Sequence, residues 1–136
     1  MNATRSACAA LWPALATPAL TALLLALPLG AHAQGASAPR AHVAAPDVYR
    51  VLAQGRQQRV LEAVLKPRQE AAAVSHPSDF VVYYVTACNL KATIDGVDIH
   101  TYPEAGTARI SLPTRSTVRR NIGSSDCRIV FIERDE

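Results

Sequence analysis

A group of arginines is the first feature of this 136-residue chain that could bind a ligand. Arg115, Arg119 and Arg120 lie among serine, threonine and asparagine in the polar segment 113–126. Guanidinium groups form paired hydrogen bonds with planar anions, so the segment is a candidate site for a phosphate, a carboxylate or an acidic polymer. A solvated loop with ordinary surface arginines explains the same pattern, and we favour that second interpretation.

A second set of polar residues alternates along the segment 90–102. Thr93, Lys91, Asp98 and His100 would share one face of a hairpin there, where they could act as acid and base groups. Cross-strand polar pairs are also what any half-exposed hairpin displays, and no nucleophile accompanies them. We therefore predict no catalytic residue from this set, and we favour a protein that is not an enzyme while leaving that question open.

Metal binding and cofactor binding find no support in the sequence. His42 and His76 lie in predicted loops, and no two histidines have the spacing that is typical of a zinc site. The prediction is therefore that the protein has no metal and no cofactor.

The cysteines predict one disulfide, between Cys88 and Cys127. Cys8 lies within a predicted signal peptide, so an even pair remains in an oxidising compartment. The bond would close a loop of about 40 residues, for which the chain-entropy model gives roughly 3 to 4 kcal/mol. The alternative is a free thiol or half of a metal site, but no histidine cluster accompanies either cysteine.

Residues 1–33 have the pattern of a cleavable signal peptide. Arg5 precedes an apolar run that is densest over residues 19–27, and Ala31-His32-Ala33 provides a cleavage site before Gln34. A membrane-spanning helix needs about 20 apolar residues, so we expect no stable span after cleavage, although an uncleaved anchor is the alternative. The predicted localisation is periplasmic or secreted.

The rest of the chain predicts one small domain. Residues 34–46 are small and proline-containing, which predicts a flexible leader, and residues 47–136 would form the domain. The net charge of the whole chain is only +3. That value is too low to indicate nucleic-acid binding.

The clearest local prediction is a β-hairpin that turns at Asp95-Gly96. Both residues accept the positive φ angles of a two-residue turn. The expected register places Ile94 opposite Val97, Ala92 opposite Ile99 and Leu90 opposite Thr101, with these apolar residues on one face.

Other segments give simpler patterns. Residues 80–87 and 127–133 are apolar on both faces, which predicts two central strands. Residues 107–112 alternate, and we expect Ala108, Ile110 and Leu112 to face inward. Residues 47–65 predict either one helix or two short helices broken at Gly55, with a strand at 48–52 as the alternative.

Together these patterns predict an α+β domain. One or two short N-terminal helices would pack on a small antiparallel sheet of about five strands, with the Cys88–Cys127 disulfide holding it. The predicted function is an exported binding or adaptor module of the bacterial cell envelope, whose partner is an unknown protein or envelope component. A small secreted enzyme or enzyme inhibitor that uses the hairpin's polar face or the arginines is the alternative. A homodimer through an uncovered sheet face is a further expectation.

Overall fold

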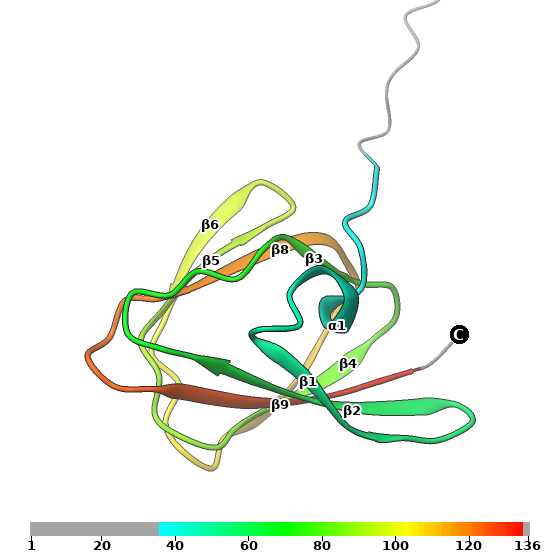
Figure 1. Cartoon of the computed structure of the whole chain (residues 1–136). Coiled ribbons are helices and arrows are strands. Elements are labelled where there is room, and N and C mark those ends of the chain that lie inside the picture. The colour runs from blue at the N-terminus through cyan, green and yellow to red at the C-terminus, as the bar shows by residue number, and fades with distance from the viewer. Residues whose placement is uncertain (1–35, 135–136) are drawn as a thin grey trace, which may run out of the picture. The chain divides into compact units, whose positions relative to one another are not determined.

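The computed structural model describes residues 36–134, which form two antiparallel β-sheets and one short helix (Figure 1). The five-stranded sheet has the order β1-β2-β9-β4-β7, formed by β1 Tyr49–Gln54, β2 Gln58–Leu65, β9 Cys127–Arg134, β4 Phe80–Tyr84 and β7 Ala108–Ser111. The four-stranded sheet has the order β3-β8-β5-β6, formed by β3 Val74–His76, β8 Thr114–Asn121, β5 Leu90–Ile94 and β6 Val97–Thr101.

The two sheets face each other and enclose one core, which we call the interior. Because side chains alternate along a strand, alternate residues of β2, β4, β8 and β9 point into it. Leu61, Ile129 and Phe131 fill it from the five-stranded sheet, and Val74 and Leu90 from the four-stranded sheet. All five of these side chains are almost fully buried.

The predicted α+β class is wrong, because residues 47–65 form strands β1 and β2 instead of helices. Leu61, Ala63 and Leu65 alternate into the interior, whereas Val60 and Val64 lie half-buried on the other face. Apolar residues on both faces of a strand give the same pattern as the two helical faces that were expected, which is why the helix prediction fails here. Gly55, at the expected helix break, lies in the turn, where its N–H donates to the carbonyl oxygen of Gln58 at 2.7 Å.

The segment predicted as a flexible leader is also different where the structure describes it. Helix α1, Ala41–Ala44, contacts β1 and β3, and Ala41 and Ala45 are buried in the core. The N–H of Ser75 donates to the carbonyl oxygen of Pro39 at 2.8 Å, which ties the segment to β3. The predicted signal peptide, residues 1–33, lies outside the described residues. Within residues 36–134, no helix is both long and apolar enough to cross a membrane.

The hairpin prediction is confirmed, including its register. Strands β5 and β6 pair Ile94 with Val97, Ala92 with Ile99 and Leu90 with Thr101. Asp95 and Gly96 form the turn with φ angles of 47° and 87°. The Asp95 carboxylate also accepts hydrogen bonds from the backbone N–H groups of residues 115 and 116, which fixes the turn against β8.

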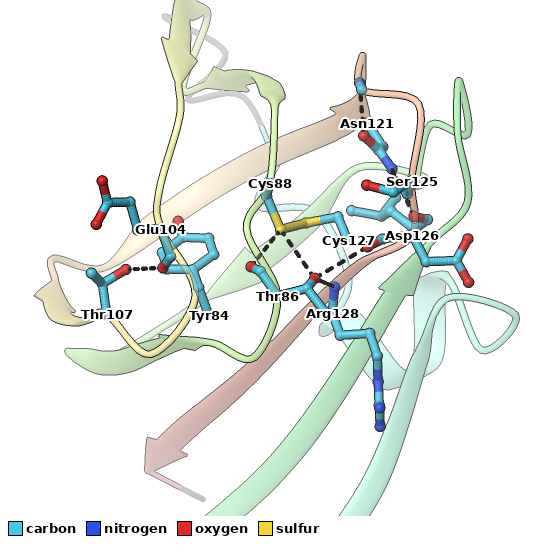
Figure 2. Close-up of a disulfide and its surroundings, with 12 residues drawn as sticks. Tyr84, Thr86, Cys88, Glu104, Thr107, Asn121, Ser125, Asp126, Cys127 and Arg128 are labelled. Atoms are coloured by element: carbon cyan, nitrogen blue, oxygen red, sulfur yellow. Dashed lines mark hydrogen bonds between the residues drawn. A yellow bond between two sulfur atoms is a disulfide. The ribbon is translucent and has the colours of Figure 1, made fainter.

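Cys88 and Cys127 are joined by a disulfide, with 5.1 Å between their Cα atoms (Figure 2). Cys127 begins β9 in one sheet, and Cys88 lies two residues before β5 in the other. The bond therefore links the two sheets at one end of the interior, where Cys127 is fully buried.

We predict that removal of this disulfide destabilises the domain without changing its fold. The Cys88→Ala/Cys127→Ala variant should lose about 2 to 4 kcal/mol of unfolding free energy, because the bond closes a long loop in the unfolded chain. Urea denaturation of both proteins with and without reductant would measure the loss. Reductant should destabilise only the wild type, and an equal effect on both would contradict the assignment.

An ion-pair cluster on the outer face of the five-stranded sheet connects three of its strands. The Glu62 carboxylate accepts hydrogen bonds from Arg50 of β1 at 2.7 Å and from Arg128 of β9 at 2.5 Å. Those bonds, from Arg128 first and then Arg50, lower the pKa of Glu62 below its usual value. The Glu62 side chain is only 7% exposed, whereas its partners are 72% and 49% exposed, so solvent screens the pairs.

We predict that Glu62→Gln lowers the unfolding free energy at pH 7 by about 1 kcal/mol. Because folding lowers the pKa of Glu62, its stabilisation is present at neutral pH and is lost as the pH falls through the folded-state pKa. The difference between the two proteins should therefore disappear in acid. Urea denaturation between pH 7 and pH 3 would measure it, with Glu104→Gln on an exposed loop as the control. A difference that does not decrease as the pH falls would contradict the ion-pair explanation.

Candidate functional site

A cavity of about 120 Å³ lies between the two sheets and is the candidate site, which we call the inner cavity. Half of its lining residues are apolar and come from β4, β5 and β6: Val82, Leu90, Ala92, Ile94 and Ile99. Polar groups complete the lining: Tyr84, Thr101, Ser111, Arg109 and Arg119. A wider depression of about 540 Å³ shares Tyr84, Thr101 and Arg109 with the inner cavity, and we call it the outer cavity. The two cavities are therefore adjacent.

Arg119 enters the inner cavity from strand β8. Thr117, Arg119 and Asn121 alternate into the interior, and all three are buried. One guanidinium nitrogen of Arg119 lies 3.2 Å from the hydroxyl of Tyr49 and 3.3 Å from Nε2 of His76. Its guanidinium carbon also stacks 4.9 Å from the centre of the Phe131 ring. These contacts fix the side chain in a largely apolar environment.

Arg109 reaches the inner cavity from β7, at the edge of the other sheet. Its guanidinium donates to the hydroxyl of Tyr84 at 2.5 Å and lies 5.1 Å from the centre of that ring. The prediction that Ile110 and Leu112 face inward is wrong, since they are 76% and 75% exposed. In the observed register Arg109 pairs with the inward-facing Val82 of β4, which puts the opposite parity of the strand inside.

His76 and Glu133 form a buried pair next to Arg119. Nδ1 of His76 lies 3.1 Å from the Glu133 carboxylate, and the imidazole stacks on Phe80 with 4.2 Å between ring centres. A carboxylate only accepts and a guanidinium only donates, so Nδ1–H donates to Glu133 and Nε2 accepts from Arg119. Burial lowers the pKa of His76 below 6.5, although the hydrogen bond to Glu133 opposes that effect. The imidazole is therefore neutral at neutral pH.

The predicted arginine site is divided by strand β8. Only Arg119 enters the interior, whereas Arg120 points to solvent and Arg115 lies exposed beside the hairpin turn. On the hairpin's polar face, Lys91 and Thr93 both contact Asp98, at 2.8 and 2.6 Å. The hydrogen bond from Lys91, and then that from Thr93, lowers the pKa of Asp98. This group lies on the surface, away from the inner cavity.

Sequence reasoning missed Arg109, His76 and Glu133. His76 was placed in a loop because β3 is only three residues long. Glu133 ends the predicted strand 127–133, and its parity with Ile129 and Phe131 was a signal that it faces the interior. Arg109 was missed because the prediction placed the opposite face of its strand, with Ala108, Ile110 and Leu112, toward the interior.

Comparison with solved structures identifies the fold. A cupin domain from Bordetella pertussis Tohama I superimposes with a TM-score of 0.61 at 19% identity, covering 75% of this chain and all of that one. A double-stranded β-helix protein from Klebsiella pneumoniae gives a TM-score of 0.52 at 20% identity, over 62% of this chain and 73% of the other. A cupin superfamily protein from Desulfitobacterium hafniense gives 0.51 at 11% identity, over 65% and 77%. No family model and no curated protein matches the sequence.

The fold is therefore a cupin-like double-stranded β-helix. The predicted function, an exported adaptor module of the cell envelope, is wrong: the structural relatives are described as cupins, and the chain has a cavity between its sheets. The descriptions signal peptide, periplasmic and secreted find no support in these relatives, none of which is described as an exported protein. The localisation itself is not tested by these comparisons.

The residues of the interior do not fit a metal ion. In residues 36–134, no group of three or more histidine, cysteine, aspartate or glutamate side chains is close enough to bind one. His76 and Glu133 supply only two ligand side chains, and both imidazole nitrogens already have partners. A guanidinium 3.3 Å from Nε2 would also repel a cation.

We predict that divalent metal ions leave the thermal stability of the protein unchanged. The interior offers a guanidinium where a metal ion would need a third ligand. Thermal unfolding with Zn²⁺, Mn²⁺ or Ni²⁺, and after dialysis against a chelator, should give the same midpoint. A stabilisation by metal that is lost in His76→Gln but kept in His100→Gln would contradict this reading of the site.

Proposed function

We propose that the protein binds a small organic anion, a carboxylate with a short apolar body, in the inner cavity. One observation carries the proposal: arginine side chains from opposite sheets, Arg109 of β7 and Arg119 of β8, line the same cavity, which also has an apolar half. Guanidinium groups match a carboxylate in shape and charge, and the apolar walls would take the rest of the ligand.

The charge balance of the inner cavity supports an anionic ligand. No aspartate or glutamate is among the residues that line it. The hydrogen-bond partners of the Arg119 guanidinium, Tyr49 and His76, are neutral, and Glu133 reaches it only through the imidazole. A buried cation is stabilised by a countercharge, and a bound carboxylate would provide one.

The size of the cavity limits the ligand. A dry cavity of about 150 Å³ is known to hold a benzene molecule, so about 120 Å³ suits roughly four to six non-hydrogen atoms. A larger acid, such as a single-ring acid with about nine or ten non-hydrogen atoms, would extend past Tyr84 and Arg109 into the outer cavity, where Tyr102 and Glu104 lie. The class of ligand is therefore a short-chain or single-ring carboxylic acid, with or without a polar extension.

The proposal is limited to binding. His76 is the group best suited to proton transfer, but it is fully buried behind Arg119 and would not touch a ligand in the inner cavity. The groups that would touch it are guanidinium and hydroxyl groups, which orient and hold an anion.

The test compares anionic probes with neutral ones of the same shape. Butyrate and benzoate should bind with saturation in calorimetric titrations, whereas butanamide and benzamide should not, because the amides carry no charge for the guanidinium groups. Arg109→Gln should weaken the binding of the acids by roughly 10- to 100-fold, the usual effect of losing a hydrogen bond to a charged group.

The matched control is Arg120→Gln, which removes an arginine from the same region of β8 but from its outer face. It should leave the affinity unchanged. Equal binding of acids and amides, or an equal loss in the Arg120→Gln variant, would contradict the proposed function.

A further inference from the structure

We propose that His76 is a positioning residue for Arg119 and couples anion binding in the inner cavity to the uptake of one proton. This inference rests on the proposed function and adds a form of regulation to it. It follows from a continuous line of buried contacts that runs from Glu133 through the imidazole and the guanidinium to the inner cavity.

The contacts leave the imidazole little freedom. Glu133 holds Nδ1 at 3.1 Å, and Phe80 and Phe131 stack on the ring with centre distances of 4.2 and 5.5 Å. Nε2 then points at the Arg119 guanidinium, 3.3 Å away. Because the ring cannot turn without losing these contacts, the position of Nε2 determines where one Arg119 nitrogen lies.

The charged and titratable groups around this line come from four strands and the helix. Glu133 of β9 and Arg119 of β8 contact the imidazole directly. Arg59 of β2 lies 4.0 Å from the Glu133 carboxylate and 3.4 Å from the ring of His42 in α1, and Tyr49 of β1 bonds to Arg119. Phe80 and Phe131 carry no charge. The imidazole thus lies between one carboxylate and one guanidinium, with a second guanidinium behind the carboxylate.

Protonation of His76 would increase the affinity of the inner cavity for an anion. Nε2 becomes a donor, so it no longer accepts from Arg119, and two cations then lie 3.3 Å apart. The guanidinium is repelled toward the cavity, and the nitrogen that bonded to the imidazole becomes available to a ligand. A bound anion would offset both positive charges. Anion binding and proton uptake therefore favour each other, and linkage makes that coupling reciprocal.

The sign of the pH dependence follows. Burial keeps the pKa of His76 below 6.5, so the imidazole is neutral at pH 7.5 and takes up its proton only in acid. The affinity of the inner cavity for an anion should therefore rise as the pH falls. A carboxylate probe would itself become protonated in this range, so the test needs an anion that stays ionised.

Benzenesulfonate is such a probe, because it remains an anion throughout the range. Its affinity for the wild type should increase roughly five- to tenfold between pH 7.5 and pH 5.0, a typical size for coupling between two sites. In His76→Gln the affinity should be the same at both pH values, because the amide oxygen can accept from Arg119 but does not titrate. His100→Gln removes an exposed histidine of β6 and should behave as the wild type does.

Glu133→Gln provides a second variant in case His76→Gln folds poorly. Loss of the carboxylate removes the group that supports the protonated imidazole, so the rise in affinity should move to lower pH. A rise at the same pH as in the wild type would overturn the coupling.

The outcomes separate this inference from the proposed function. Sulfonate binding with equal pH dependence in the wild type and His76→Gln would overturn the role of His76 but leave anion binding intact. Absence of saturable binding at every pH would overturn both. A measurement without ligand adds an independent check: the NMR signal of the Arg119 side-chain N–H should shift along the titration curve of His76, and a signal that stays constant would also overturn the inference.

Discussion

The buried hydrogen-bond chain of Glu133, His76 and Arg119 is the interaction on which the interior depends. A charged side chain in a small core is costly unless it is paired and hydrogen-bonded. Here the Glu133 carboxylate accepts a hydrogen bond from the imidazole of β3 at 3.1 Å and lies 4.0 Å from Arg59 of β2, which supplies the opposite charge. Removal of His76 would take one hydrogen-bond partner from Glu133 and one from Arg119.

The two sheets are linked in different ways at the two ends of the interior. Strand β9 begins at Cys127 and carries Glu133 near its other end, so the disulfide and the Glu133–His76 pair lie apart along one strand. Near the disulfide, the buried Asn121 side chain donates to the carbonyl oxygens of Leu65 at 2.9 Å and Ser125 at 2.7 Å. A covalent bond joins the sheets at one end, and charged hydrogen bonds join them at the other. The inner cavity is lined by residues of both sheets, and Arg119 of the charged group is one of them.

The sequence was most informative where a turn has a chemical requirement. Asp95-Gly96 fixed both the hairpin and its register, because few residues accept two consecutive positive φ angles. It was least informative for residues 47–65, since Val60 and Val64 make both faces of β2 apolar and conceal its period. The orientation of β7 could not be obtained from alternation alone, because an edge strand that places Arg109 inside and Ile110 outside inverts the usual pattern.

The candidate site could be predicted only in part from the sequence, for a related reason. Strand parity separates Arg119 from Arg120, but the importance of Arg119 depends on His76, which lies 43 positions away and meets it only through the pairing of β3 with β8. Two arginines with different surroundings then line one cavity. Arg119 is held by buried partners and is pre-organised, whereas Arg109 lies on an edge strand and bonds only to the Tyr84 hydroxyl. A ligand would thus bind to one pre-organised guanidinium, that of Arg119, and to a second that can change its position, that of Arg109. Arg119 is also the residue that contacts His76, the group proposed to take up the proton.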